Sequence, residues 1–527
     1  MSLRASIQGA LGDIEMADIT AKPLPYVLVT FVFIVLVYSL SSKPKSNAPL
    51  LNPRETFEFS GQRAKGVFYQ DCRALLRNWF DSHPSEPAQL ITDYGHVTVL
   101  PPSMANEIRN DPKLSFADFS ADFFQTEYPG FEAPLEGTKD YITLTVINKD
   151  LTKFLAKITK PLADETAIAI AASFGESKEW HSLPLRDTIL TCIARISSRV
   201  FLGEELCRNE AWLKISQEYA TTVFPATDIL RVYPAGIIRS IAARVLPICR
   251  AAQAQVAEAR SILQPVLDRR AAAKAAAAAD GKALEFNDAI DWFENAATKA
   301  KAKYDPAAMQ LFLSIVAIHT TSDLMSQIMT DLAAHPEIID DLRKEIKDVL
   351  SDGGWKKTTL TNMKLLDSVI KESQRLKPIQ LATMQRKARA DVKLSDGTFI
   401  PKGGFLAVST HHHWDDATYP NANEWDGYRF YKMRHSGEPG KENTSQLVAT
   451  TAEHLGFGHG IHACPGRFFA ANEVKIALVF TLLNYDWKLP EGVKPKIDEF
   501  GVALTTDATV QVLVRKREGD FDLSAIE

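Results

Sequence analysis

Residues 457–467 read Phe457-Gly458-His459-Gly460-Ile461-His462-Ala463-Cys464-Pro465-Gly466-Arg467, and an apolar run begins at Phe468. The glycines let the backbone turn tightly and approach a flat ligand, and the run after them has helical periodicity. A thiol at a helix start lies beside unpaired N–H groups, which lower its pKa and favour a charged sulfur. Such a thiol can serve as an anionic metal ligand, and Phe457 can shield its sulfur from water, although a lone cysteine at a helix start is ordinarily structural.

Composition and charge exclude several classes of protein. The chain has 527 residues, 46% of them hydrophobic and 24% charged, which is typical of a folded protein and not of a collagen-like or disordered chain. A net charge of −5 gives no indication of nucleic-acid binding. The five cysteines are odd in number and lack CxxC spacing, so we expect reduced thiols facing the cytosol.

An uncharged stretch over 23–42 is long enough to span a bilayer, about 30 Å at ~1.5 Å per residue. The alternatives to a retained anchor are a cleaved signal peptide and a buried core helix. Acidic residues precede the stretch, which argues against the signal peptide. Basic residues after it weakly favour a cytosolic body. The expected organisation is an N-terminal tail over 1–22, a transmembrane anchor over 23–42, a linker over 43–54 and one catalytic domain over 55–527.

Regular structure after the linker is expected to be mainly helical. Helical periodicity covers 167–172, 185–201, 251–279 and 474–483, and short strands are expected over 97–100, 392–394, 399–400, 405–409 and 510–514. No repeat of 20 to 50 residues is present.

The pattern F-x-x-G-x-x-x-C-x-G before a helix resembles the haem-binding loop of the cytochrome P450 family, although a cysteine at a helix start is ordinarily structural. The resemblance implies a mainly α fold with small β-sheets, preceded here by one transmembrane helix. It implies haem b with Cys464 as the axial iron ligand and with Phe457, Gly458 and His462 at the cofactor. His462 replaces the arginine that most members have. Arg386 lies where the family often has an arginine paired with a haem propionate; a surface arginine is the alternative.

Two arginines and a glutamate resemble the structural network of the family. Glu372 and Arg375 form an E-x-x-R pair in a helix expected over 366–376, where the i,i+3 spacing puts both on one face. Alone, such a pair is most often a surface ion pair. Trp425-Asp426-Gly427-Tyr428-Arg429-Phe430 resembles the loop that supplies a second arginine, so Arg429 is the expected third partner.

A long helix is predicted from Asp305-Pro306 to Ala334, with a capping aspartate and His335-Pro336 as its stop. In the family such a helix crosses the distal haem face. The resemblance implies that Thr320 lies where dioxygen binds and protons arrive, with His319 in the place of the usual acid. A threonine inside a helix is otherwise back-bonded to its own backbone.

The implied activity is oxidation of an apolar secondary metabolite by a monooxygenase on the endoplasmic reticulum membrane. Electrons would come from NADPH through a separate NADPH–cytochrome P450 reductase, with cytochrome b5 as a further partner. The chain resembles fungal members of the ent-kaurene oxidase and polyketide-hydroxylase branches, so a terpenoid or meroterpenoid is the expected substrate and a reduced polyketide the alternative. Aromatic residues over 116–131 and the segment 379–384 are candidate pocket walls. A haem-thiolate isomerase or dehydratase, and a haem carrier or sensor, are the other classes.

Overall fold

The computed structural model describes residues 27–30, 46–56, 58, 61–519 and 521–526. The chain divides into two units, Met1–Asn47 and Ala48–Glu527. In the first unit, residues 27–30 are helical and exposed. The predicted tail, and the rest of the predicted anchor over 23–42, lie outside the described residues.

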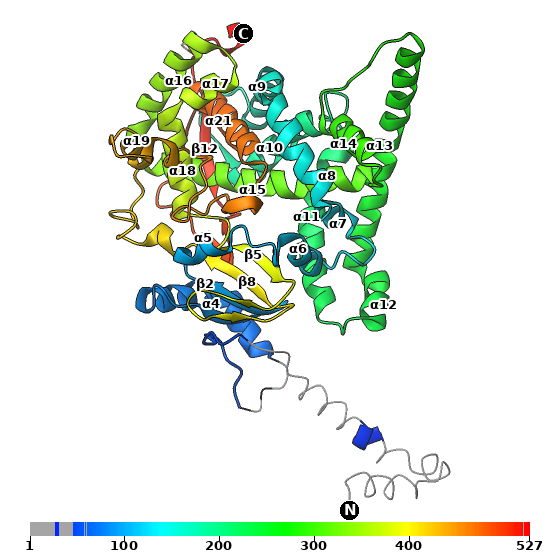
Figure 1. Ribbon diagram of the computed structural model, residues 1–527. Coiled ribbons are helices and arrows are strands. Elements are labelled where there is room, and N and C mark those ends of the chain that lie inside the picture. The colour runs from blue at the N-terminus through cyan, green and yellow to red at the C-terminus, as the bar shows by residue number, and fades with distance from the viewer. Residues whose placement is uncertain (1–26, 31–45, 57, 59–60, 520, 527) are drawn as a thin grey trace, which may run out of the picture. The chain divides into compact units, whose positions relative to one another are not determined.

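The second unit is mainly helical with small β-sheets. Figure 1 shows α4 and the largest sheet on one side and most helices on the other. The helices are α4 (Gln62–Ser82), α5 (Ala105–Ile108), α6 (Phe116–Phe124), α7 (Glu132–Gly137), α8 (Asp140–Thr145), α9 (Thr152–Phe174), α10 (Leu185–Phe201), α11 (Glu210–Arg231), α12 (Ile237–Val245), α13 (Pro247–Ala279), α14 (Ala289–Ala300), α15 (Pro306–Ala334), α16 (Ile339–Gly353), α17 (Lys357–Asn362), α18 (Lys364–Leu376), α19 (Arg429–Arg434), α20 (Lys441–Thr444) and α21 (Arg467–Asn484), with a π-helical segment η2 (Val146–Leu151) before α9.

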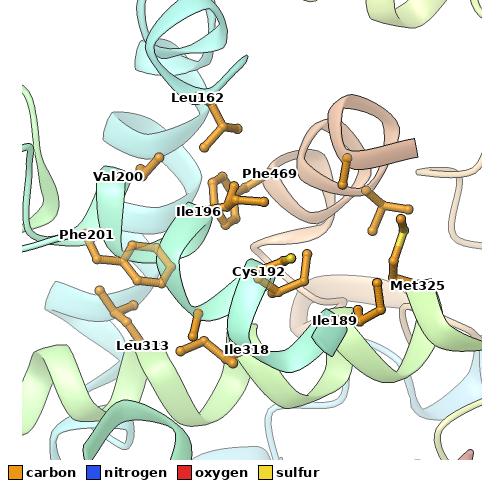
Figure 2. Packing of buried hydrophobic residues seen from close by; sticks show 14 of the residues in the cluster. Leu162, Ile189, Cys192, Ile196, Val200, Phe201, Leu313, Ile318, Met325 and Phe469 are labelled. Atoms are coloured by element: carbon orange, nitrogen blue, oxygen red, sulfur yellow. The ribbon is translucent and has the colours of Figure 1, made fainter. Parts of the chain in front are cut away.

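Helix α15 is the centre of the core. It has the predicted bounds, because the Asp305 carboxylate accepts the N–H groups of Ala307 and Ala308 and the helix ends before His335. Helices α10, α11, α18 and α21 pack against it. In Figure 2, Leu313 and Ile318 of α15 lie beside Phe201 of α10, close to Phe469 of α21. Among the described helices α15 alone is long and apolar enough to cross a membrane, but 67% of its most apolar window is buried, as in a core helix.

The five-stranded sheet has the order β1-β2-β8-β5-β3, with β2 and β8 parallel and the other neighbours antiparallel. Its strands are β1 (Ala88–Thr92), β2 (Gly95–Leu100), β3 (Leu114–Ser115), β5 (Ala382–Ala388) and β8 (Phe405–Ser409). The smaller sheets contain β4 (His181–Pro184), β12 (Gln511–Lys516) and β9 (Tyr485–Lys488); β10 (Ile497–Phe500) and β11 (Ala503–Thr506); and β6 (Val392–Lys393) and β7 (Phe399–Ile400).

The beginning of the second unit is attached to the large sheet. The Asn52 side chain donates to the carbonyls of Ala64 and Ile91, each at 2.9 Å, and accepts the Ile91 N–H at 2.8 Å. Asn52 is 2% exposed. Part of the segment expected as a linker over 43–54 therefore belongs to the folded second unit.

Candidate active site

The Cys464 loop closes on itself through its backbone. The Cys464 N–H donates to the Phe457 carbonyl at 2.8 Å, and the Gly458 N–H donates to Leu455 at 2.9 Å. Gly460 has φ +83°, and a Cβ atom there would stand 2.5 Å from the Cβ of Arg109. Only glycine allows that approach, so the loop is docked against the end of α5.

Opposing influences act on the Cys464 thiol. Burial raises its pKa, while the N–H groups of Gly466 and Arg467 and the Arg467 charge lower it. The helix start thus acts in the expected direction, but burial outweighs it. The net direction is upward because a buried anion loses its hydration. A metal cation bound to the sulfur deprotonates a thiol outright.

Arg386, Phe116 and His462 lie close together beside this loop. Arg386 is 2% exposed, and its guanidinium carbon lies 5.8 Å from the centre of the Phe116 ring. That ring is 6.3 Å from the His462 ring. Burial and the charges of Arg386 and Arg389 lower the pKa of His462 to about 4, so His462 is neutral at pH 7 and offers a hydrogen bond, not a charge.

The Arg386 guanidinium has unused hydrogen-bonding capacity. One terminal nitrogen donates to the Gln385 carbonyl at 2.7 Å, but Nε and the other terminal nitrogen have no partner among the residues that the structure describes. Burial lowers the pKa of Arg386 to about 10, so it stays charged at pH 7. A buried cation with free N–H groups requires an anion. A haem propionate fits this requirement, as Cys464 fits the iron.

A solvent-accessible stripe interrupts the burial of α15. Phe312, Val316, Thr320 and Leu324, spaced one turn apart, are half-buried or exposed, and Val316 is 44% exposed. The Thr320 hydroxyl donates to the Val316 carbonyl at 2.8 Å, which is the back-bonded arrangement. Its oxygen keeps lone pairs for a further hydrogen bond.

The His319 side chain forms its hydrogen bond with another helix and not with its own. Its Nε2–H donates to the Gln217 carbonyl of α11 at 2.9 Å, because a carbonyl can only accept. Burial lowers its pKa, and the nearby Arg186 charge acts in the same direction. His319 is therefore a neutral link between α15 and α11 at pH 7.

Glu372, Arg375 and Arg429 meet in a buried network. The Glu372 carboxylate accepts two hydrogen bonds from Arg375, both at 2.8 Å, and one from Arg429 Nε at 3.0 Å. The side chains of Glu372 and Arg375 are both 0% exposed. Arg375 and Arg429 also donate to backbone carbonyls of residues 413–424. The network thus ties α18 to the segment before α19.

A second buried ion pair was not anticipated from the sequence. Asp323 of α15 pairs with Lys377 after α18 and accepts the Thr506 N–H at 2.8 Å. Burial lowers the pKa of Lys377 to about 7. The available signal was a carboxylate inside an apolar helix, since such groups are almost never buried unpaired.

Comparisons with known proteins identify the family of the chain. The sequence model of the family described as Cytochrome P450 matches residues 135–514. The chain is 46% identical over 509 residues to cytochrome P450 monooxygenase TRI1 of Fusarium sporotrichioides, covering 96% of this chain and 92% of that protein. It is 47% identical over 499 residues to cytochrome P450 monooxygenase hepE of Aspergillus oryzae, covering 94% and 90%.

The fold has solved counterparts. A crystal structure of the cytochrome P450DA heme domain matches with a TM-score of 0.65 at 15% identity, covering 89% of this chain and 97% of that chain. At that identity the match shows the fold, while the family follows from the sequence comparisons. The chain therefore belongs to the cytochrome P450 family, an oxidoreductase family whose fold implies a haem cofactor, and its fungal relatives are named monooxygenases.

Proposed function

We propose that the protein is a membrane-anchored monooxygenase that oxidises an apolar fungal secondary metabolite, a terpenoid or meroterpenoid. Electrons come from NADPH through NADPH–cytochrome P450 reductase on the endoplasmic reticulum membrane, with cytochrome b5 as an auxiliary donor. The body faces the cytosol. The observation that carries the proposal is Cys464 in its docked loop beside a buried, unsatisfied Arg386, in a chain of this family.

Residues of the chain have separate roles in this proposal. Haem bound through Cys464 supplies the activation of dioxygen. Arg386 and His462 hold a propionate by hydrogen bonds, and Phe457 limits access of water to the sulfur. Thr320 orients a proton donor on the accessible stripe of α15, and His319 is the proposed relay beside it. Glu372, Arg375 and Arg429 hold the surrounding loops.

Exposed apolar side chains support an apolar substrate. Val316, Phe116, Phe224 and Ile379 are 38–44% exposed, and they come from α15, α6, α11 and the segment before β5. Helix α11 packs against α15 and α6, and α6 packs against β5. Of the aromatic residues over 116–131, Phe119, Tyr128 and Phe131 are buried core, so the half-exposed ones are the candidates for substrate contact.

The proposal is tested by incubating extracts of a strain lacking this protein. Membranes containing the protein, the reductase and NADPH are expected to convert one metabolite into a product heavier by one oxygen atom, seen by mass spectrometry. Membranes with the Cys464→Ala variant are the control. A terpenoid product supports the proposed substrate class, and a polyketide product contradicts it. A product of unchanged or dehydrated mass, formed without NADPH, identifies an isomerase or dehydratase instead.

Removal of residues 1–42 is expected to release the protein from membranes without loss of haem, because this deletion takes the predicted anchor and spares Asn52. Membrane fractionation after carbonate washing measures the release, and the haem content per protein measures whether haem is kept. Removal of residues 1–54 is the comparison. It deletes the Asn52 hydrogen bonds to Ala64 and Ile91 and is expected to lower the thermal midpoint. Complete retention of the shorter deletion on membranes would show a second anchor.

Thr320→Ala is expected to keep haem and substrate binding but to divert reducing equivalents to hydrogen peroxide. Product formed per NADPH should fall roughly tenfold, the effect of losing one hydrogen bond of about 1.4 kcal/mol. Thr320→Ser should restore much of the coupling because it keeps the hydroxyl. Thr321→Ala is the matched control, since Thr321 is 3% exposed and lies on the buried side of α15. Unchanged coupling in Thr320→Ala would remove the threonine from the mechanism.

His319 is tested separately. If His319 is a proton relay, His319→Ala is expected to uncouple the enzyme as Thr320→Ala does. His319→Glu is then expected to recover part of the coupling, because the glutamate restores the family's acid. Coupling that is unchanged in His319→Ala assigns proton entry to water and leaves His319 as the link to Gln217.

A further inference from the structure

Strand β5 contains an irregularity immediately before Arg386. Thr383 pairs with Val408 of β8, but the next pair is Arg386 with Leu406. Two residues of β5, Met384 and Gln385, therefore stand opposite the single Ala407. Met384 has φ +54°, in the left-handed region that non-glycine residues rarely adopt. This is a β-bulge with a left-handed methionine.

The bulge decides which face of the sheet Arg386 occupies. Residues paired across a sheet share a face, so Arg386 lies on the face of Leu406 and Val408. That face packs with Leu455 and Ala452, just before the Cys464 loop. The opposite face, with Ala382 and Ala407, packs with residues of α4.

Regular pairing would exchange the two faces. Because the side-chain period of a strand is two residues, a β5 that continued the Thr383–Val408 register without a bulge would pair Arg386 with Phe405 and turn it to the α4 face. Gln385 would take its place opposite Leu406. A guanidinium would then stand in the apolar cluster of Phe68, Val97 and Ala407.

Local contacts of Gln385 and Met384 hold the bulge, and they do not use Nε or the unpaired terminal nitrogen of Arg386. The Gln385 side chain donates to the Ala382 carbonyl at 3.1 Å and to Gln380 Oε1 at 2.6 Å. Met384 is 4% exposed and packs in the same cluster as Leu406. The strained conformation is therefore fixed by its surroundings, as expected of strain at a functional position.

We propose that Met384 is a positioning residue: its left-handed bulge turns the Arg386 guanidinium toward Phe116 and His462, where it binds a haem propionate. The inference rests on the proposed role of Arg386 and adds a cause for its orientation. It predicts that the backbone conformation at 384, not the methionine side chain itself, controls how firmly haem is held.

Two isomeric side chains separate backbone conformation from volume. Met384→Leu introduces a side chain that is unbranched at Cβ. Met384→Ile introduces the isomer of leucine that is branched at Cβ, and this branch strongly disfavours positive φ. The readout is the rate of haem loss from the full-length ferric holoprotein to excess apomyoglobin, followed by absorbance. Arg386→Ala and the double variant Met384→Ile/Arg386→Ala complete the set. Circular dichroism of each variant shows whether it is folded.

Met384→Leu is expected to lose haem at the parental rate. Met384→Ile and Arg386→Ala are each expected to lose it roughly tenfold faster, the effect of one hydrogen bond to a charged group, and the double variant no faster than Arg386→Ala. If Met384→Ile does not fold, Met384→Gly, which permits φ +54°, is expected to keep the parental rate.

Parental haem retention in Met384→Ile, multiplied effects in the double variant, or rapid loss in Met384→Gly would each overturn the role of Met384. A parental rate in Arg386→Ala would overturn the propionate assignment itself. The two failures are therefore distinguishable.

Discussion

Cys464→Ala is expected to abolish the red-shifted Soret band that reduced protein gives with carbon monoxide, and with it all oxidation of substrate. The band reports a thiolate on the iron, and alanine has no ligand to offer. The effect is complete because the other four cysteines are buried elsewhere.

The other cysteines are the controls. Cys72→Ala, Cys192→Ala, Cys207→Ala and Cys249→Ala should each keep the band. A normal band in Cys464→Ala, or loss of the band in one of these four variants with its fold intact, would assign the iron to another ligand.

Glu372→Ala is expected to prevent accumulation of folded holoprotein. The substitution leaves Arg375 and Arg429 buried without their carboxylate, and removal of one partner from a buried ion pair costs about 3–5 kcal/mol. That is a large part of the about 5–15 kcal/mol that stabilises a typical domain. Haem content per protein and the thermal midpoint measure the effect.

Asp164→Ala is the matched control for Glu372→Ala. Asp164 pairs with Lys160 at 2.5 Å, but the side chains are 58% and 41% exposed. Loss of an exposed pair costs about 0–1 kcal/mol, so haem content should not change. Equal stability of Glu372→Ala and the parent would show that the buried network does not hold the fold.

Structural features that depend only on neighbouring residues in the sequence were predictable. The Asp305 cap and the helix stop at His335 gave the bounds of α15, because capping acts within one turn. The helices expected over 167–172 and 474–483 are instead α9 and α21, which are longer. Their polar residues mask the periodicity, and contacts with the rest of the core extend them.

Features that depend on distant residues were not predictable. Strand β5, Ala-Thr-Met-Gln-Arg-Lys-Ala, has little strand propensity, and pairing with β8 creates both the strand and its bulge. The direction of the Cys464 pKa depends on burial, and the orientation of His319 on the Gln217 carbonyl of α11. Sequence identified Arg386 as a candidate, but only the fold shows its unsatisfied N–H groups.

The origin of the oxygen atom in the product tests the central claim most directly. Membranes with this protein, the reductase and NADPH are supplied with ¹⁸O₂ in ordinary water and the extract of the strain lacking the protein. A monooxygenase places one ¹⁸O atom in the new product, and the label is absent when Cys464→Ala replaces the parent. A product that carries only oxygen from water, or that forms without dioxygen, would contradict the account.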